Sequence, residues 1–194
     1  MQSGSRCLHS ILPHNPRPNI LCAMKKTLSS IIAVFSLIAL PFAASAGSVT
    51  VKGVHLCCGG CVKGVDKALS KVTGIDFNVN RKGKSVEISG SEAALKKGLA
   101  ALGNAGYTGK TDGALKVPAT KVKKGKVKSL TLSGVHLCCG ACVKQAKAAI
   151  KDVAGITGNT IANRVKSFEV TGNFEPQELI DALAAAGFSG RLAK

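Results

Sequence analysis

Two nearly identical loops contain most of the side chains of this 194-residue chain that could do chemistry. The first reads GVHLCCGGCVK (53–63), and the second reads GVHLCCGACVK (134–144). Thiolate sulfur and imidazole nitrogen are ligands for soft and borderline metal ions such as Cu(I), Hg(II) and Zn(II). The candidate metal ligands are the cysteines and the histidine of each loop: His55, Cys57, Cys58, Cys61, His136, Cys138, Cys139 and Cys142.

Within each loop, the C-x-x-C pair is the first choice of ligands. Each pair lies where a predicted strand meets a predicted helix, and a helix N-terminus favours the thiolate form that binds metal. Cys57 and Cys138 come second, because consecutive side chains of extended backbone point to opposite sides. His55 and His136 come third, and with them each loop offers a Cys3His set of the kind zinc prefers. The two loops could hold one ion each or share one ion between them.

Thiols at this spacing also support other functions. A C-x-x-C pair lowers the pKa of a thiol and serves thiol–disulfide enzymes, but those motifs usually lie in a thioredoxin-like context that this chain lacks. An exported chain could instead use its cysteines as disulfides in an interaction module. Three cysteines per loop cannot all pair within one loop, so a pure disulfide staple fits less well.

The chain around the loops repeats as well, which predicts two small tandem domains. The offset of the loops also relates Gly74 to Gly155 and Gly106 to Gly187, with a one-residue slip in between. The first copy is expected to begin with a strand over 48–53, followed by a helix that stops at Gly74 and has one apolar face: Val62, Val65, Leu69 and Val72. A hairpin that turns at 81–84 comes next. A second helix, with Leu95, Leu99 and Leu102 on one face, then leads to a short strand from Tyr107. The second copy starts with a strand over 129–134 and ends with a strand from Phe188. This order, β-α-β-β-α-β, predicts an α+β chain of two ferredoxin-like domains, at 47–110 and 129–194.

The C-x-x-C-Val sequence that enters the first helix, with Gly-Tyr or Gly-Phe after the second, resembles the heavy-metal-associated domain family. This family includes copper chaperones, modules of metal-pumping ATPases and the periplasmic mercury-binding protein. The resemblance implies two copies that bind Cu(I), Zn(II) or Hg(II) through Cys58/Cys61 and Cys139/Cys142 and exchange it with a donor or acceptor protein. It also implies that Tyr107 and Phe188 close the apolar side of each loop. The chain departs from the family pattern in having Leu56 and Leu137 at the usual Met position and two additional residues before each pair.

The N-terminus predicts export. Lys25 and Lys26 precede an apolar run over 28–40 and the small residues Ala44-Ser45-Ala46, which together form a signal peptide over 24–46. The run is too short to span a bilayer comfortably, so a retained anchor is the weaker interpretation. Residues 1–23 are expected to be a misassigned extension before Met24. Export places the protein in the periplasm or outside the cell.

Charge and composition exclude several classes of function. Removing four basic residues with 1–46 reduces the net charge from +17 to +13, and six lysines lie in the predicted linker 111–128. We expect this linker to be solvated; contact with an anionic surface or an acidic partner is the alternative. Aromatic residues are only 4% of the chain, and export makes nucleic acid an unsuitable partner. No catalytic grouping of serine, histidine and carboxylates is present, so the sequence predicts a metal-binding protein and not an enzyme.

Overall fold

The structure is a computed structural model that describes residues 46–193, and these all lie in one compact unit. The predicted extension 1–23 and signal peptide 24–46 lie outside the described residues, except for Ala46, which begins the first strand. Within the described range, no helix combines the length and the apolar character that crossing a membrane requires.

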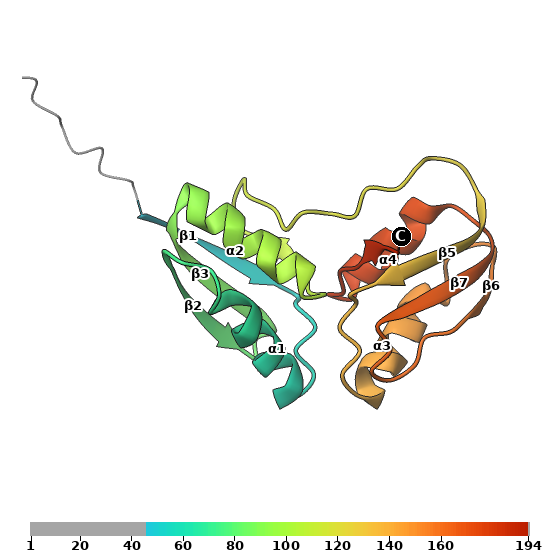
Figure 1. The fold of residues 1–194 in the computed structure, drawn as a ribbon, viewed down its shortest axis with the longest axis horizontal. Helices are drawn as coiled ribbons and strands as arrows, with labels where there is room; N and C mark the ends of the chain where they lie inside the picture. Colours follow the sequence, from blue (N-terminus) through green and yellow to red (C-terminus); the bar gives the residue numbers. More distant parts are fainter. Residues whose placement is uncertain (1–45, 194) are drawn as a thin grey trace, which may run out of the picture. The chain divides into compact units, whose positions relative to one another are not determined.

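Two halves with the same order of elements follow one another along the chain (Figure 1). The first half consists of β1 (Ala46–Lys52), α1 (Gly59–Leu69), β2 (Ile75–Asn80), β3 (Ser85–Ser91), α2 (Glu92–Asn104) and β4 (Lys110–Thr111). The second half consists of β5 (Val127–Ser133), α3 (Gly140–Ile150), β6 (Ile156–Asn159), β7 (Ser167–Phe174), α4 (Pro176–Ala185) and β8 (Arg191–Leu192). The predicted α+β class and the β-α-β-β-α-β order are confirmed in both halves.

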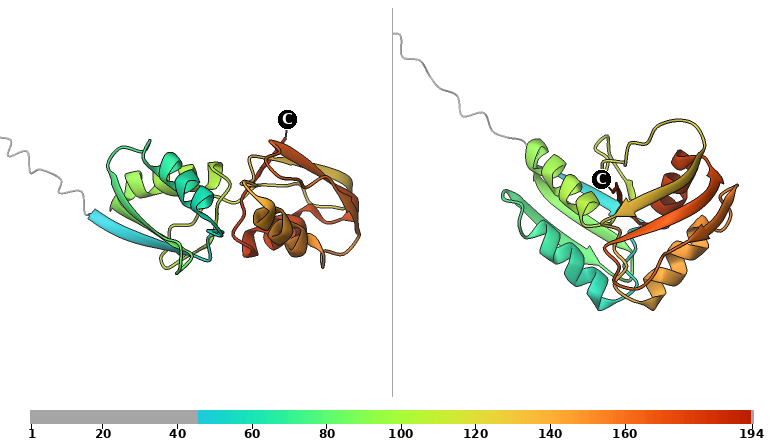
Figure 2. Two further views of the ribbon diagram at one scale, coloured as in Figure 1. Left: turned by 90° about the horizontal axis from the view of Figure 1, so that it is seen from below. Right: turned by 45° about the vertical axis from the view of Figure 1, so that its right-hand side comes forward.

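Each half is a four-stranded antiparallel sheet with its two helices on one face (Figures 1 and 2). The strand orders are β2-β3-β1-β4 and β6-β7-β5-β8, so the first strand of each half lies inside its sheet. Val49 pairs with Ile88 and Val51 with Val86, and all four side chains are buried beneath the helices. Alternating burial along β1 and β3 therefore fixes which face the helices cover.

Several predicted boundaries differ from the structure. α1 ends at Leu69 with its cap at Ser70, so the expected helical position Val72 lies beyond the helix, and Gly74 is the left-handed residue that leads into β2 instead of the stop. The last strands begin three residues after Tyr107 and Phe188, which instead pair with each other as an isolated bridge. The end of α1 involves local hydrogen bonds, in which Ser70 N donates to the Asp66 carbonyl and Val72 N to that of Leu69, whereas the last strands begin where the chain pairs with β1 and β5.

The one-residue slip in the repeat has a structural counterpart. In the first half β2 pairs with β3 without interruption, whereas β6 has a bulge between Ile156 and Gly158 opposite β7. A bulge absorbs one additional residue without changing which side chains face the core. The two sheets thus keep equivalent cores despite the insertion.

The sequence predicted a solvated linker between the two halves, but part of the segment between β4 and β5 packs against them. The six lysines of the predicted linker 111–128 are exposed, but Val117 is buried against Gly103 of α2, and the Thr120 hydroxyl donates to the carbonyl of Gly190. The pattern of isolated apolar residues among lysines was too sparse to predict this packing. The linker is therefore fastened to both halves along part of its length.

Candidate metal centre

The six cysteines of the two loops converge on one point. Nine pairs of their Sγ atoms lie 3.5–3.9 Å apart, and five of these pairs join one loop to the other. The shortest separation, 3.5 Å, joins Cys57 of the first loop to Cys142 of the second. All six are free cysteines. The structure thus brings together every cysteine that the sequence proposed as a ligand, and the two loops form one cluster instead of two separate ones.

The start of each loop helix positions the C-x-x-C pair. Cys58 and Cys139 are the N-cap residues of α1 and α3, with extended backbone, so their side chains lie beside the first turn. Cys61 and Cys142 lie in that first turn and are fully buried. Each pair therefore combines a buried sulfur with a partly exposed one, and the partly exposed one lies close to backbone N–H groups of the first turn.

The cysteine that precedes each pair also belongs to the cluster. Cys57 Sγ lies 3.6 Å from that of Cys61, and Cys138 Sγ lies 3.6 Å from that of Cys142. The alternation of extended backbone ranked Cys57 and Cys138 second as ligands, but in the structure both neighbouring sulfurs of each loop reach the centre. The centre lies between the loops, so Cys57 contacts Cys139 while Cys58 contacts Cys138.

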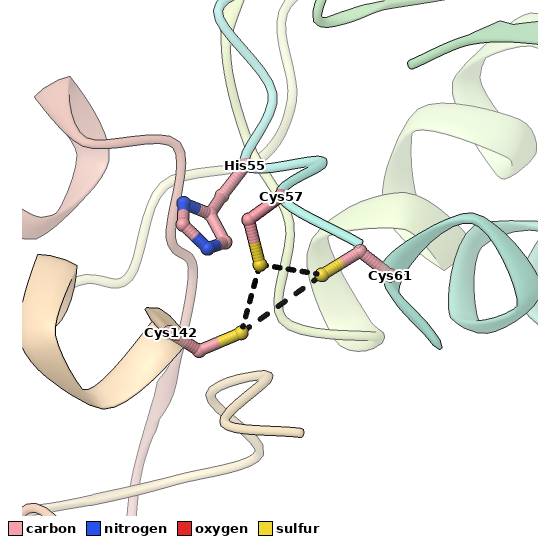
Figure 3. Close-up of side chains that lie close together, drawn as sticks. All are labelled: His55, Cys57, Cys61 and Cys142. Atoms are coloured by element: carbon pink, nitrogen blue, oxygen red, sulfur yellow. Dashed lines mark hydrogen bonds between the residues drawn. The ribbon is translucent and has the colours of Figure 1, made fainter. Parts of the chain in front are cut away.

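His55 and His136 are not equivalent. His55 offers a ring nitrogen within 4.8 Å of the sulfurs of Cys57, Cys61 and Cys142, and Figure 3 shows its ring beside their triangle. Among the described residues, no comparable group of ligands includes His136. The Nε2 atom of each histidine is buried without a hydrogen-bond partner in the described part of the chain. The prediction of a histidine ligand thus receives geometric support at His55 but not at His136.

The two halves are joined by contacts around the repeated Gly-aromatic pairs. Thr108 N donates to the Gly187 carbonyl (3.2 Å), and Ser189 N donates to the Gly106 carbonyl (3.0 Å). Gly106 and Gly187 have φ of +91° and +84°, and a Cβ at either would collide with the backbone of the other half's loop. Glycine is required here both for the backbone conformation and for the close approach. The sequence showed the repeat of these glycines but not this role.

Each repeated aromatic ring supports the histidine of the opposite half. Phe188 stacks on His55 at a centroid distance of 4.3 Å, and Tyr107 stacks on His136 at 4.6 Å. Tyr107 also donates its hydroxyl hydrogen to the Cys61 carbonyl (2.9 Å). The resemblance implied that each ring closes its own loop; the structure shows in addition that each ring packs against the other loop.

Burial and backbone dipoles divide the thiols into two classes. Desolvation, followed by contacts with neighbouring sulfurs, raises the pKa of Cys57 and Cys138 far above the usual range. Backbone N–H groups at the start of α3 lower the pKa of Cys139 to about 6, and those at the start of α1 lower that of Cys58. Burial lowers the pKa of both histidines, which keeps them neutral and able to act as ligands. The partly exposed thiols at the helix starts therefore ionise first.

One basic side chain outside the loops also contacts this region. Arg81, in the turn between β2 and β3, donates from Nη2 to the Cys57 carbonyl (3.2 Å). In the second half the corresponding connection is longer, and the backbone N–H of Arg164 donates to the Leu137 carbonyl (2.7 Å). The sequence predicted a turn at 81–84 and assigned no role to Arg164, because nothing in the local pattern indicated which loop either residue would reach.

The comparisons with known proteins agree with this centre in one half. Residues 48–108 match the family model of the heavy-metal-associated domain. The first half is thus a heavy-metal-associated domain. This range contains His55, all three cysteines of the first loop and Tyr107, so the resemblance predicted from the sequence is confirmed for the first half.

Wider comparisons add little to the heavy-metal-associated match. No curated protein matches the chain. Among solved structures, the N-terminal soluble domains of Bacillus subtilis CopA are 16% identical, with 77% of this chain and 95% of that chain covered and a TM-score of 0.30. The first two RRM domains of yeast poly(U) binding protein (Pub1) are 10% identical, with 76% and 99% covered and a TM-score of 0.24. TM-scores this low do not establish a shared arrangement of the whole chain.

Proposed function

We propose that this protein is an exported metal carrier that binds a soft metal ion, Cu(I), Zn(II) or Hg(II), and buffers it or passes it to a partner protein. The observation that carries the proposal is the convergence of six free cysteine sulfurs from two loops, with nine pairs 3.5–3.9 Å apart. The heavy-metal-associated match at residues 48–108 supports it independently. The second half, with the same fold and an almost identical loop, contributes as a second module of the same kind.

The chemistry of the donors fits a metal ion better than it fits six thiols alone. Within the described residues, the side chains that contact these sulfurs are other cysteines, and for Cys57 and Cys138 these contacts raise the pKa, so a neighbouring thiolate opposes their ionisation. A bound soft cation removes this opposition because it neutralises the thiolates it coordinates. The buried, unpartnered Nε2 of His55 offers a further donor next to three of the sulfurs.

Transfer to a partner requires sulfurs that another protein can reach. Cys58 and Cys139 are partly exposed at the starts of their helices, whereas Cys61 and Cys142 are fully buried. Thiolate exchange would begin at the exposed pair, where an acceptor thiolate can attack a bound ion, and finish at the buried pair. The carrier thus needs no deep pocket and no catalytic step.

The test is metal content together with the number of free thiols, on the chain purified from the cell envelope without reducing agent. We expect near-stoichiometric soft metal that is lost in the Cys58→Ser/Cys139→Ser variant. The matched control is Lys63→Ser/Lys144→Ser, a pair of exposed side chains at equivalent positions of α1 and α3, and it should keep the metal. A chain that takes up no metal before or after reduction, with its cysteines paired, would overturn the proposal in favour of a disulfide-bearing or redox module. N-terminal sequencing of the same sample tests export, since cleavage after Ala46 is expected.

A further inference from the structure

The six sulfurs are arranged with a regularity that two separate sites would not need. Each sulfur is grouped with four of the other five, within 4.8 Å, which places the six at the corners of an octahedron. Four three-sulfur groups form alternate faces of this octahedron, and every sulfur belongs to two of these groups. The groups are Cys57–Cys61–Cys142, Cys57–Cys58–Cys139, Cys58–Cys61–Cys138 and Cys138–Cys139–Cys142.

An octahedron of thiolates with four occupied triangular faces is the framework of a four-metal cluster. In such a cluster each ion has three sulfur ligands, and each sulfur bridges two ions through two of its lone pairs. A metal–sulfur bond of about 2.3 Å places three sulfurs around one ion about 4.0 Å apart, by plane geometry. The observed separations of 3.5–3.9 Å between nine of the pairs are close to this value.

Coordination number and charge select Cu(I) for this framework. Cu(I) is soft and is stable with three thiolate ligands, whereas structural Zn(II) takes four ligands. Only one of the four groups has a fourth donor in the described residues, the ring nitrogen of His55. Four Cu(I) ions and six thiolates also leave a formal charge of only −2, and binding releases the protons of those thiols that are still protonated, without any change of oxidation state.

We propose that the two loops form one site for a tetranuclear Cu(I)–thiolate cluster, with four copper ions bridged by the six cysteine sulfurs. This inference rests on the proposed function, and it specifies the stoichiometry and the metal. It assigns bridging roles to Cys57 and Cys138, which lie outside the C-x-x-C pairs. It also makes the second half indispensable, because three of the four groups take sulfurs from both loops.

The experiment is an anaerobic titration of the reduced chain with Cu(I), followed by native mass spectrometry. The chain carries Cys7→Ser and Cys22→Ser so that the six loop cysteines are its only thiols, and the unsubstituted chain is measured beside it. We expect a single cooperative step in which metal-free and four-copper chains coexist while one- to three-copper chains stay scarce. X-ray absorption of the four-copper form should show copper–copper scattering, which isolated sites lack.

Two variants separate a cluster from two independent sites. Cys57→Ser and Cys138→Ser each remove a sulfur from two of the four groups, so each should abolish the four-copper species. Independent C-x-x-C sites would instead retain two copper ions per chain in both variants. Cys139→Ser changes a partly exposed side chain, and it should also abolish the four-copper species in a variant whose circular dichroism shows an intact fold.

The outcomes distinguish this inference from the function on which it rests. Two Cu(I) ions per chain that fill independently, or any final stoichiometry other than four, would overturn the cluster and leave metal binding intact. Failure of the reduced chain to bind Cu(I), Zn(II) or Hg(II) would overturn the proposed function itself.

Discussion

The two halves of the molecule have nearly the same loop and the same fold, yet they surround their loops differently. The loops differ only at Gly60 and Ala141. Behind them, Tyr107 places a hydroxyl on the Cys61 carbonyl, whereas Phe188 in the other half has no hydroxyl to donate. Of the two loop histidines, only His55 belongs to a group of candidate metal ligands in the described residues. Identical motifs thus acquire different properties from the residues packed against them.

A second pair of positions shows how this difference is built. Gly64 of α1 leaves room for the Tyr107 hydroxyl and the His136 ring, and the equivalent residue of α3 is Gln145. In the second half, where the ring is Phe188, no hydroxyl needs that space. The small residue and the hydroxyl are therefore one linked feature of the first half.

The largest expected difference is in thiol reactivity. In the reduced, metal-free chain at pH 7, Cys139 should be alkylated at least about 10-fold faster than Cys57 or Cys138, because its pKa is lowered to about 6 and theirs are raised. Cys58, whose pKa is lowered by the same kind of helix start, should react next. Peptide mapping by mass spectrometry after brief exposure to iodoacetamide measures the order.

The pH dependence of this reaction follows from the same shift. The thiolate is the reactive form, so the rate at Cys139 should fall roughly tenfold between pH 7 and pH 5 as the group becomes protonated. A rate at Cys139 that stays level over this range, or equals that of Cys138, would contradict the difference between the helix-start thiols and the cysteines that precede them.

The next effect tests the linked pair of the first half. Gly64→Ala places a Cβ against the Tyr107 hydroxyl and 3.0 Å from His136 Cε1, so it should reduce the free energy of unfolding by about 1–3 kcal/mol. Combining it with Tyr107→Phe removes the overlapping oxygen and should recover part of the loss. Urea unfolding of both single variants and the double variant gives the coupling energy. Strictly additive effects would show that the two residues are not linked.

The smallest expected effect concerns the N-terminal caps of α2 and α4, the second helix of each half. Ser91 caps α2, where its side chain accepts from Ala94 N at 3.3 Å, whereas α4 begins at Pro176 without a side-chain cap. Ser91→Ala should lower the free energy of unfolding by about 1 kcal/mol, the usual effect of losing an N-cap. Thermal unfolding measures it, and Glu178→Ala in the first turn of α4 is the control, with an expected change within about 0.5 kcal/mol. A larger loss in the control would mean that the two helix starts are stabilised alike.

Local pattern predicted most of the fold because the repeat shows each element twice. Alternation in β1 and helical spacing around Leu95 and Leu99 identify the elements, since both patterns reflect burial on one face. The end of α1 was missed because Val72 continues the apolar spacing beyond the capping residue Ser70. The place of the last strands was missed because it depends on pairing with residues far along the chain. Val117 was missed for the same reason: its burial comes from Gly103 of α2, which no local pattern reveals.

For the candidate site, too, some features could be predicted from the sequence and others only from the structure. The sequence by itself determined the ligand types and their spacing, because a strand that leads into a helix must place a C-x-x-C pair beside the helix N-terminus. Only the tertiary structure decided that the six sulfurs form one cluster, that Cys57 and Cys58 both reach it, and that His55 joins it while His136 does not. The physical reason is that these outcomes depend on the close approach of the two loops at Gly106 and Gly187. Gly106 meets the backbone at Gly134 and His136, about 30 residues away, and Gly187 meets it at Gly53 and His55, about 130 residues away, so neither loop encodes the contact alone.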